Sequence, residues 1–228
     1  MNINHLRWGN IVFLFLLVLI SNAVESKAAK RGWYVGGGVA TQALSGGFEE
    51  GVCYSTEPGC TGTVIFPGQF DSGRGMAINA GFRFSQNFSL DFFKASTEHE
   101  AEHPALPNTV QKATLESSLL GPRIHFGIGT DALEFFLRGG YAMYGLEYDK
   151  ATSTDGGKAS KYALFSGSGW GYGVGLEIFF RKIGVELGYT RYNGNLDLLF
   201  ADGSLDKIDP VDIQITTTNI SVAYHFGN

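Results

Sequence analysis

The stretch from Glu98 to Pro104, with the sequence EHEAEHP, has the letter pattern of a zinc site. In the motif H-E-x-x-H, a helix places two imidazoles on one face to hold zinc, and the Glu acts as general base. Here Pro104 and Pro107 follow at once, so a helix does not run on past His103. We therefore predict a solvated loop that picks up a divalent ion at most weakly, and not a zinc peptidase. No cofactor is expected.

The first residues predict export. Arg7 precedes an apolar run from Ile11 to Ile20, which is too short for a transmembrane helix of roughly 20 apolar residues. Ser21-Asn22-Ala23 then offers small residues where a signal peptidase cuts. We expect a signal peptide over residues 1–23, with a second candidate cut as late as residue 29, and one domain over 30–228. The alternative is an uncleaved membrane anchor.

Composition narrows the class of the exported domain. The net charge of −5 argues against nucleic acid as a partner. The chain holds 32 glycines, 14% aromatic residues and 17% charged residues, and it has no second apolar run of helix-spanning length. An exported chain of this kind is a secreted β protein or a membrane β-barrel.

Cys53 and Cys60 are the two cysteines of the chain, and a turn-rich segment separates them. A metal site needs more ligands than two thiols, and exported chains meet an oxidising environment. We predict a local disulfide between them.

From Gly32 onward, large apolar residues alternate with glycines and charged residues at the period of two that is typical of strands. In the segment from Gly169 to Phe180, one face is aromatic and aliphatic, and the other carries glycines and Glu177. The alternation recurs along the chain and predicts eight strands, around residues 33–40, 76–84, 88–92, 120–126, 134–143, 170–180, 183–189 and 220–226.

The predicted connections alternate in length. Short turns fall at 85–87, 127–131 and 181–182, and long polar segments fall at about 44–72, 97–112, 150–164 and 195–212. Bacterial outer-membrane barrels have short periplasmic turns and long extracellular loops. The sequence therefore predicts an all-β fold, an eight-stranded antiparallel up-and-down transmembrane β-barrel over residues 30–228.

The charges within strands lie on the face opposite the large apolar residues. A lipocalin would turn the apolar face inward, whereas a membrane barrel turns it to lipid and encloses the charges. We favour the membrane barrel. The predicted lumen charge network is Arg83, Asp91, Arg123, Glu134, Arg138, Glu177 and Glu186, and the predicted aromatic girdle is Trp33, Trp170, Tyr172, Tyr189, Tyr224 and Phe226.

Some positions need separate treatment. Lys94 falls on the lipid face, so we expect it at the outer rim, or else a bulge near Phe93 that resets the register. Phe136 and Phe179 fall on the luminal face and are expected to fill space. His125 and His225 share that face and are expected to join the network near the periplasmic end.

Three segments resemble the small outer-membrane β-barrel family that includes the OmpA transmembrane domain and OmpX. They are Trp33 to Gly38, Leu119 to Phe126 and the closing Ile220 to Phe226, and the resemblance covers essentially the whole mature chain. It implies the outer membrane of a Gram-negative bacterium. In that family the last strand usually ends the protein with an aromatic residue, whereas here Gly227 and Asn228 follow.

The expected role follows from the narrow lumen. Side chains just fill the interior of an eight-stranded barrel, so we expect ion pairs to plug it. The predicted protein is a monomer in outer-membrane lipid, with a structural role or contacts to a host or phage surface through its extracellular loops.

Two other functions compete with this one. The first is a narrow gated channel. The second is an enzyme, because some similar barrels modify lipid A with a Ser and a His near the outer rim. Ser96 and His99 are the nearest approach, and no orienting acid is evident beyond Glu98, so we expect no enzymatic activity.

Overall fold

The computed structural model describes residues 31–46, 71–102, 109–128, 130–148, 152–153, 163–201 and 210–226. The predicted signal peptide, the predicted disulfide between Cys53 and Cys60, and His103 lie outside these residues. Among the described residues, no helix is long and apolar enough to cross a membrane.

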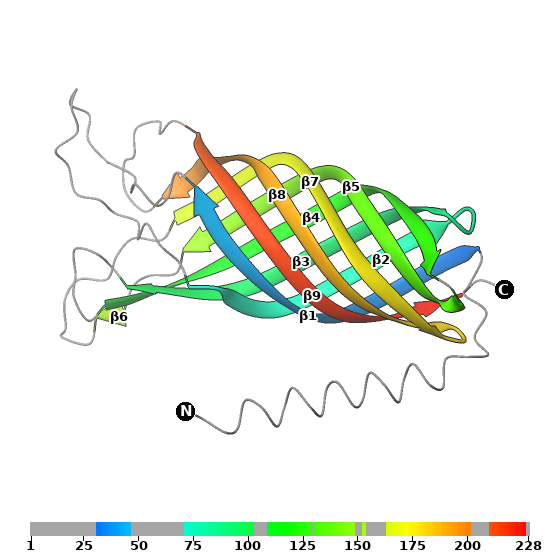
Figure 1. Ribbon diagram of the computed structural model, residues 1–228. Coiled ribbons are helices and arrows are strands. Elements are labelled where there is room, and N and C mark those ends of the chain that lie inside the picture. The colour runs from blue at the N-terminus through cyan, green and yellow to red at the C-terminus, as the bar shows by residue number, and fades with distance from the viewer. Residues whose placement is uncertain are drawn as a thin grey trace, which may run out of the picture.

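Eight long strands form a closed antiparallel barrel in the described part of the chain, which confirms the predicted fold (Figure 1). Each long strand pairs with the next along the chain, and the last strand pairs with the first. The two-residue strand β6 (Thr152–Ser153) adds to the start of β4. The long strands are β1 (Gly32–Gly46), β2 (Gly73–Arg83), β3 (Phe88–Glu102), β4 (Thr109–Ile128), β5 (Thr130–Tyr148), β7 (Ala163–Phe180), β8 (Ile183–Ala201) and β9 (Val211–His225).

The ladder between β1 and β9 closes the barrel. It runs from the pair Tyr34 and His225 to the pair Gly46 and Ile213 without a break. A closed barrel leaves no strand edge, so the backbone N–H and C=O groups in lipid are satisfied by neighbouring strands.

Two of the predicted loops are shorter than the sequence suggests. Strand β3 continues to Glu102 and β4 begins at Thr109, so most of the predicted loop 97–112 is a paired ladder. In the same way β8 continues to Ala201 and β9 begins at Val211, within the predicted loop 195–212. Some polar side chains that suggested loops, such as Glu98 and Glu100, occupy outward positions of strands, whereas Thr97 and His99 face the lumen. The prediction that His99 lies in a solvated loop is therefore wrong.

The predicted short turns join strands at the opposite end. Residues 85–87 link β2 to β3, and Arg181 and Lys182 link β7 to β8. The third turn is tighter than predicted, because β4 reaches Ile128 and β5 begins at Thr130, with a register irregularity beside Gly127.

Lys94 sits in an unbroken ladder, so the bulge suggested near Phe93 is not present. Its Nζ lies 2.9 Å from Oε2 of Glu116, and both side chains are partly exposed on the outer face. Lys94 pairs with Ser118 of β4. The expected position of Lys94 at the outer rim stays a prediction.

The outer wall carries two groups of aromatic side chains. Near the short turns, Trp33 packs edge-on against Phe82, and Tyr224 packs against Phe226. Further along the barrel, Tyr141 packs edge-on against Trp170, whose side chain is 70% exposed. All six predicted girdle residues have exposed side chains. Paired aromatic bands of this kind mark the two interfaces of a membrane barrel.

Glycines on the inner face make room for large luminal side chains. A Cβ on Gly175 would overlap the ring of Phe136 and the carbonyl oxygen of Leu187. By contrast, a Cβ on Gly37, which faces outward, would meet one atom, the carbonyl oxygen of Ala77, at 3.5 Å.

We predict that Gly175→Val destabilises the barrel by about 1–3 kcal/mol or more, the usual cost of overpacking. Urea unfolding of the refolded protein in lipid vesicles, followed by tryptophan fluorescence, measures this. Gly37→Val is the matched control and should stay close to wild type. Equal losses from the two variants would contradict the proposed crowding of the inner face.

Candidate functional site: the lumen

Three arginines from different strands pair with carboxylates inside the barrel. Arg123 of β4 donates from its two terminal nitrogens to Oε2 of Glu186 at 2.8 Å and to Oε2 of Glu177 at 2.7 Å. Arg138 of β5 donates to the other oxygen of Glu186 at 2.5 Å. One carboxylate of β8 therefore joins two arginines from the far side of the lumen.

The remaining predicted charges complete the network. The Nη1 atom of Arg138 lies 3.6 Å from Oδ2 of Asp91. Arg83 lies 2.8 Å from Oε1 of Glu134 and also bonds to the backbone carbonyls of Ser85 and Gln86 in the adjacent turn. The structure thus places all seven predicted charges on the inner face, where every one of these side chains is at most 8% exposed.

An aromatic ring also contacts two of the arginines. The guanidinium carbon of Arg123 lies 3.7 Å from the ring centroid of Phe136, and that of Arg138 lies 4.8 Å from the same centroid. Phe136 therefore contacts both cations and attracts them through its ring. Alternation placed Phe136 in the lumen as space filler, and it could not reveal these contacts with Arg123 of the neighbouring strand and with Arg138 of its own strand.

Neutral polar side chains also belong to the network, and the sequence interpretation did not select them. The hydroxyl of Tyr34 donates to Asp91 at 2.6 Å. The amide of Asn219 donates to Glu186 at 3.1 Å, and that of Asn79 lies 3.4 Å from the same carboxylate. The alternation in the sequence places these side chains on the inner face. Their hydrogen-bond partners are evident only in the closed barrel.

Two histidines lie at the end of the lumen near the short turns. The Nε2 atom of His125 is 2.9 Å from the hydroxyl of Ser89, and its Nδ1 atom is 3.2 Å from Oε2 of Glu134. The Nε2 atom of His225 is 3.0 Å from Oε1 of Glu177. His125, Glu134 and Glu177 are also the described residues whose donor atoms lie close enough together to hold a metal ion.

The other half of the lumen is largely apolar. Toward the end of the longer connections, inward-facing residues of all eight long strands pack into a buried cluster. The sequence interpretation expected a polar plug and did not predict this block, because several of these residues lie in or beside predicted loops. The largest members are Leu44, Phe93, Leu115, Leu119, Tyr144, Leu146, Phe165, Tyr192, Leu196, Ile213 and Ile215.

A hydrogen-bonded belt runs through this apolar block. Gln42 donates to Ser117 at 2.6 Å and to Thr217 at 2.9 Å, and it accepts from Thr97 at 2.8 Å. His99 follows, with its ring nitrogens 2.8 Å from the Thr97 hydroxyl and from the carbonyl oxygen of Asp71. His99 is buried.

The Ser–His pair that the lipid A-modifying alternative would need does not form. His99 faces the lumen within the belt, whereas Ser96 lies three positions earlier, on the outward parity of β3. A nucleophile and its base must lie within hydrogen-bond reach, and these side chains point to opposite sides of the wall.

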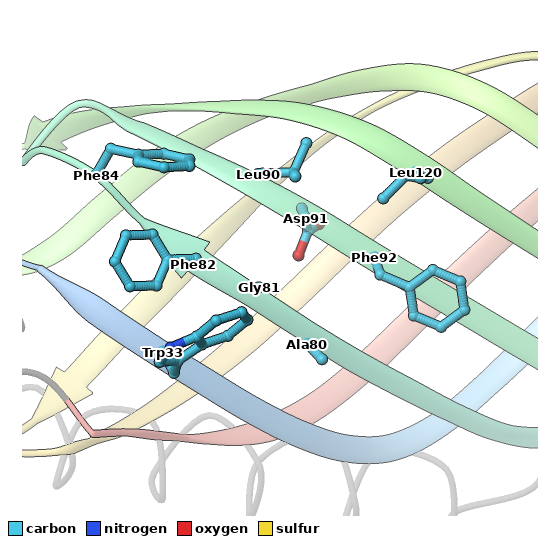
Figure 2. A pocket seen from close by; sticks show the side chains of 9 residues that line it. All are labelled: Trp33, Ala80, Gly81, Phe82, Phe84, Leu90, Asp91, Phe92 and Leu120. Atoms are coloured by element: carbon cyan, nitrogen blue, oxygen red, sulfur yellow. The ribbon is translucent and has the colours of Figure 1, made fainter.

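The outer wall has one further feature, a groove of about 410 Å³ over β1 to β4 (Figure 2). Its floor is low because Ala80 and Gly81 of β2 are small, and Figure 2 shows Trp33, Phe82 and Phe84 rising beside them. Leu90, Phe92 and Leu120 continue the lining toward β4. The groove opens outward, so it is a feature of the wall and not of the lumen.

We predict that Arg138→Ala lowers the free energy of unfolding by about 3–5 kcal/mol, because it leaves Asp91 and one oxygen of Glu186 buried without their cation. Urea unfolding in vesicles measures the loss. The control is Lys94→Ala, which removes the partly exposed outer pair with Glu116 and should cost less than about 1 kcal/mol. A loss from Arg138→Ala no larger than that from Lys94→Ala would contradict a tightly coupled network.

A profile of the family described as outer membrane protein beta-barrel domain matches residues 11–226. A search of the curated proteins finds no significant match.

Solved structures of outer-membrane proteins share the fold. OprG from Pseudomonas aeruginosa is 13% identical with a TM-score of 0.58, over 90% of this chain and 100% of that one. AlkL, solved by solid-state NMR in DMPC lipid bilayers, is 11% identical with a TM-score of 0.59, over 90% and 94%. Neisserial surface protein A is 14% identical with a TM-score of 0.51, over 86% and 97%.

Proposed function

This chain belongs to the outer membrane protein beta-barrel domain family, and from that premise we propose that it is a closed barrel that presents extracellular segments and passes no solute. Its place is the outer membrane of a Gram-negative bacterium. The observation that carries the proposal is that two successive blocks of side chains, one charged and one apolar, occupy the lumen.

The charged block opposes conduction because its groups bind one another. Glu186 accepts from both Arg123 and Arg138, and Arg123 also holds Glu177. An ion that entered would have to separate these buried pairs, and each separation leaves an uncompensated charge. Fixed pairs therefore act as a plug.

The apolar block opposes conduction in a different way. An ion that leaves its hydration shell gains nothing from aliphatic and aromatic walls, and hydrophobic constrictions close pores by excluding water. Leu115, Phe165 and Leu196 come from three different strands and are fully buried within this block. The second block would keep the barrel closed even if the first were loosened.

The segments that join the long strands at the apolar end carry the proposed interaction role. Outer-membrane barrels have short periplasmic turns, so this end faces the cell exterior. The segments include residues 47–70, where the predicted disulfide and several aromatic residues lie, and their contacts with a host or phage surface are the proposed function. The proposed signal peptide, residues 1–23, would be removed on export.

We predict no conductance steps from the refolded wild-type protein in a planar lipid bilayer, and none from Arg138→Ala, since the apolar block remains. A general porin in the same bilayer is the control for the sensitivity of the recording. Steps from wild type that Arg138→Ala alters in size or ion preference would mean that the lumen charges line a pathway, and the closed-barrel proposal would fail.

A second experiment addresses the extracellular segments. We predict that replacing residues 47–70 with a short glycine–serine linker leaves a folded, heat-resistant barrel on SDS gels but lowers the binding of expressing cells to host cells or phage. A linker of the same kind at the turn 85–87 is the control. Unchanged binding with the first replacement would remove this segment from the proposed role.

A further inference from the structure

The end of the lumen near the short turns brings together three potential metal ligands from three strands. They are His125 of β4, Glu134 of β5 and Glu177 of β7, and their donor atoms all lie within 4.8 Å of one another. Each residue is at most 6% exposed. The group is therefore an internal cluster and not a solvated acidic patch.

Two of the donor atoms have no partner other than each other within the described part of the chain. They are Nδ1 of His125 and Oε2 of Glu134, and they face each other at 3.2 Å. In a tetrahedral zinc site with bonds of about 2.0–2.1 Å, ligand atoms lie about 3.3 Å apart. The spacing already present is close to that of two ligands on one ion.

From this geometry we propose that the lumen binds one zinc-type divalent cation at its periplasmic mouth, through His125 Nδ1 and the carboxylates of Glu134 and Glu177. Imidazole and carboxylate are the nitrogen and oxygen donors that zinc accepts. Three protein ligands leave the fourth position of a tetrahedral ion for water.

The groups around the cluster orient His125 and Glu134 so that the proposed donor atoms face the ion. Ser89 lies 2.9 Å from Nε2 of His125, so when Nε2 donates to that hydroxyl, the lone pair of Nδ1 points to Glu134. Metal-binding histidines almost always bond through their other ring nitrogen in this way. Arg83 holds the opposite oxygen of Glu134, at 2.8 Å.

Glu177 is the ligand that must adjust. Its Oε2 accepts from Arg123 at 2.7 Å, and its Oε1 lies 3.0 Å from Nε2 of His225. A small rotation of the carboxylate brings one oxygen toward the ion while the other keeps a partner. His225 is thus a positioning residue, placed behind Glu177 and not on the ion.

Charge favours a cation at this end. The luminal network has four carboxylates and three guanidinium groups, which leaves one excess negative charge while the histidines are neutral. Arg83 and Arg123 lower the affinity of the cluster for a divalent ion, but each already has a carboxylate oxygen as partner. The bound ion would contact the donor atoms that these arginines do not hold.

The space beside the cluster is open on the side of the turn. Gly127 follows His125 at the next inward position of β4, and a Cβ built there would meet no heavy atom within 4 Å. An ion from the periplasm therefore does not have to pass the apolar block, and a local movement of side chains must uncover the buried Nδ1 atom.

Titration of the refolded, metal-free barrel with Zn²⁺ in a calorimeter tests the proposal, with Co²⁺ absorption as a second readout of tetrahedral geometry. We expect one ion per wild-type chain, about tenfold or greater weakening in His125→Gln, and a loss of similar size in Ser89→Ala, which removes the orienting partner and keeps all three ligands. Heat-shifted migration on SDS gels verifies that each variant is folded.

The matched control is His103→Gln, which removes the histidine that follows β3 in the EHEAEHP stretch. It should leave the Zn²⁺ affinity unchanged. Two outcomes would overturn the proposal. One is the absence of Zn²⁺ binding by wild type, which would leave His125 and Glu134 as a proton-sharing pair. The other is binding that His103→Gln abolishes and His125→Gln does not.

Discussion

Closure of the barrel by the pairing of β1 with β9 is the constraint on which the other features depend. A bilayer offers no water to backbone N–H and C=O groups, so the eight strands must satisfy one another. Eight strands enclose a space that side chains just fill, and what faces inward must therefore pack or pair. This is why glycines such as Gly175 stand opposite large residues such as Phe136, and why the luminal charges meet across the barrel.

The ion pairs do more than neutralise charge, because they join strands that are not neighbours. Arg123 of β4 holds Glu177 of β7 and Glu186 of β8, and Arg138 of β5 holds Glu186 as well. A shift of one strand by a single residue would turn its charged set to lipid and leave its partners unpaired. The network therefore specifies the register of the barrel. The apolar block at the other end fills volume but does not select specific pairs of residues.

Much of the fold was predictable from alternation, and the reason is physical. Lipid on one side and a narrow lumen on the other impose opposite chemistry on successive residues, so the eight strands and their faces could be read directly. Strand ends were harder to predict. Beyond the membrane the outward residues of β3, such as Glu98 and Glu100, are polar, and the pattern resembles a loop although the backbone ladder continues to Glu102. That error hid the luminal position of His99. Contacts such as that of Arg123 of β4 with Glu186 of β8 depend on closure and shear, which alternation does not encode.

The two ends of the lumen differ in kind, and this difference limits where function can lie. Apart from the hydrogen-bonded belt of Gln42, Thr97 and His99, the packing at the extracellular end is apolar and has no directional requirement. The strands there can therefore carry long segments of varied sequence without changing the interior. The periplasmic end has the opposite character, because imidazole and carboxylate groups such as those of His125 and Glu134 need specific partners at specific distances. A side chain held there by Ser89 or Arg83 has little freedom to adapt. Recognition of a large partner therefore suits the extracellular segments, and recognition of a small cation suits the rigid periplasmic mouth.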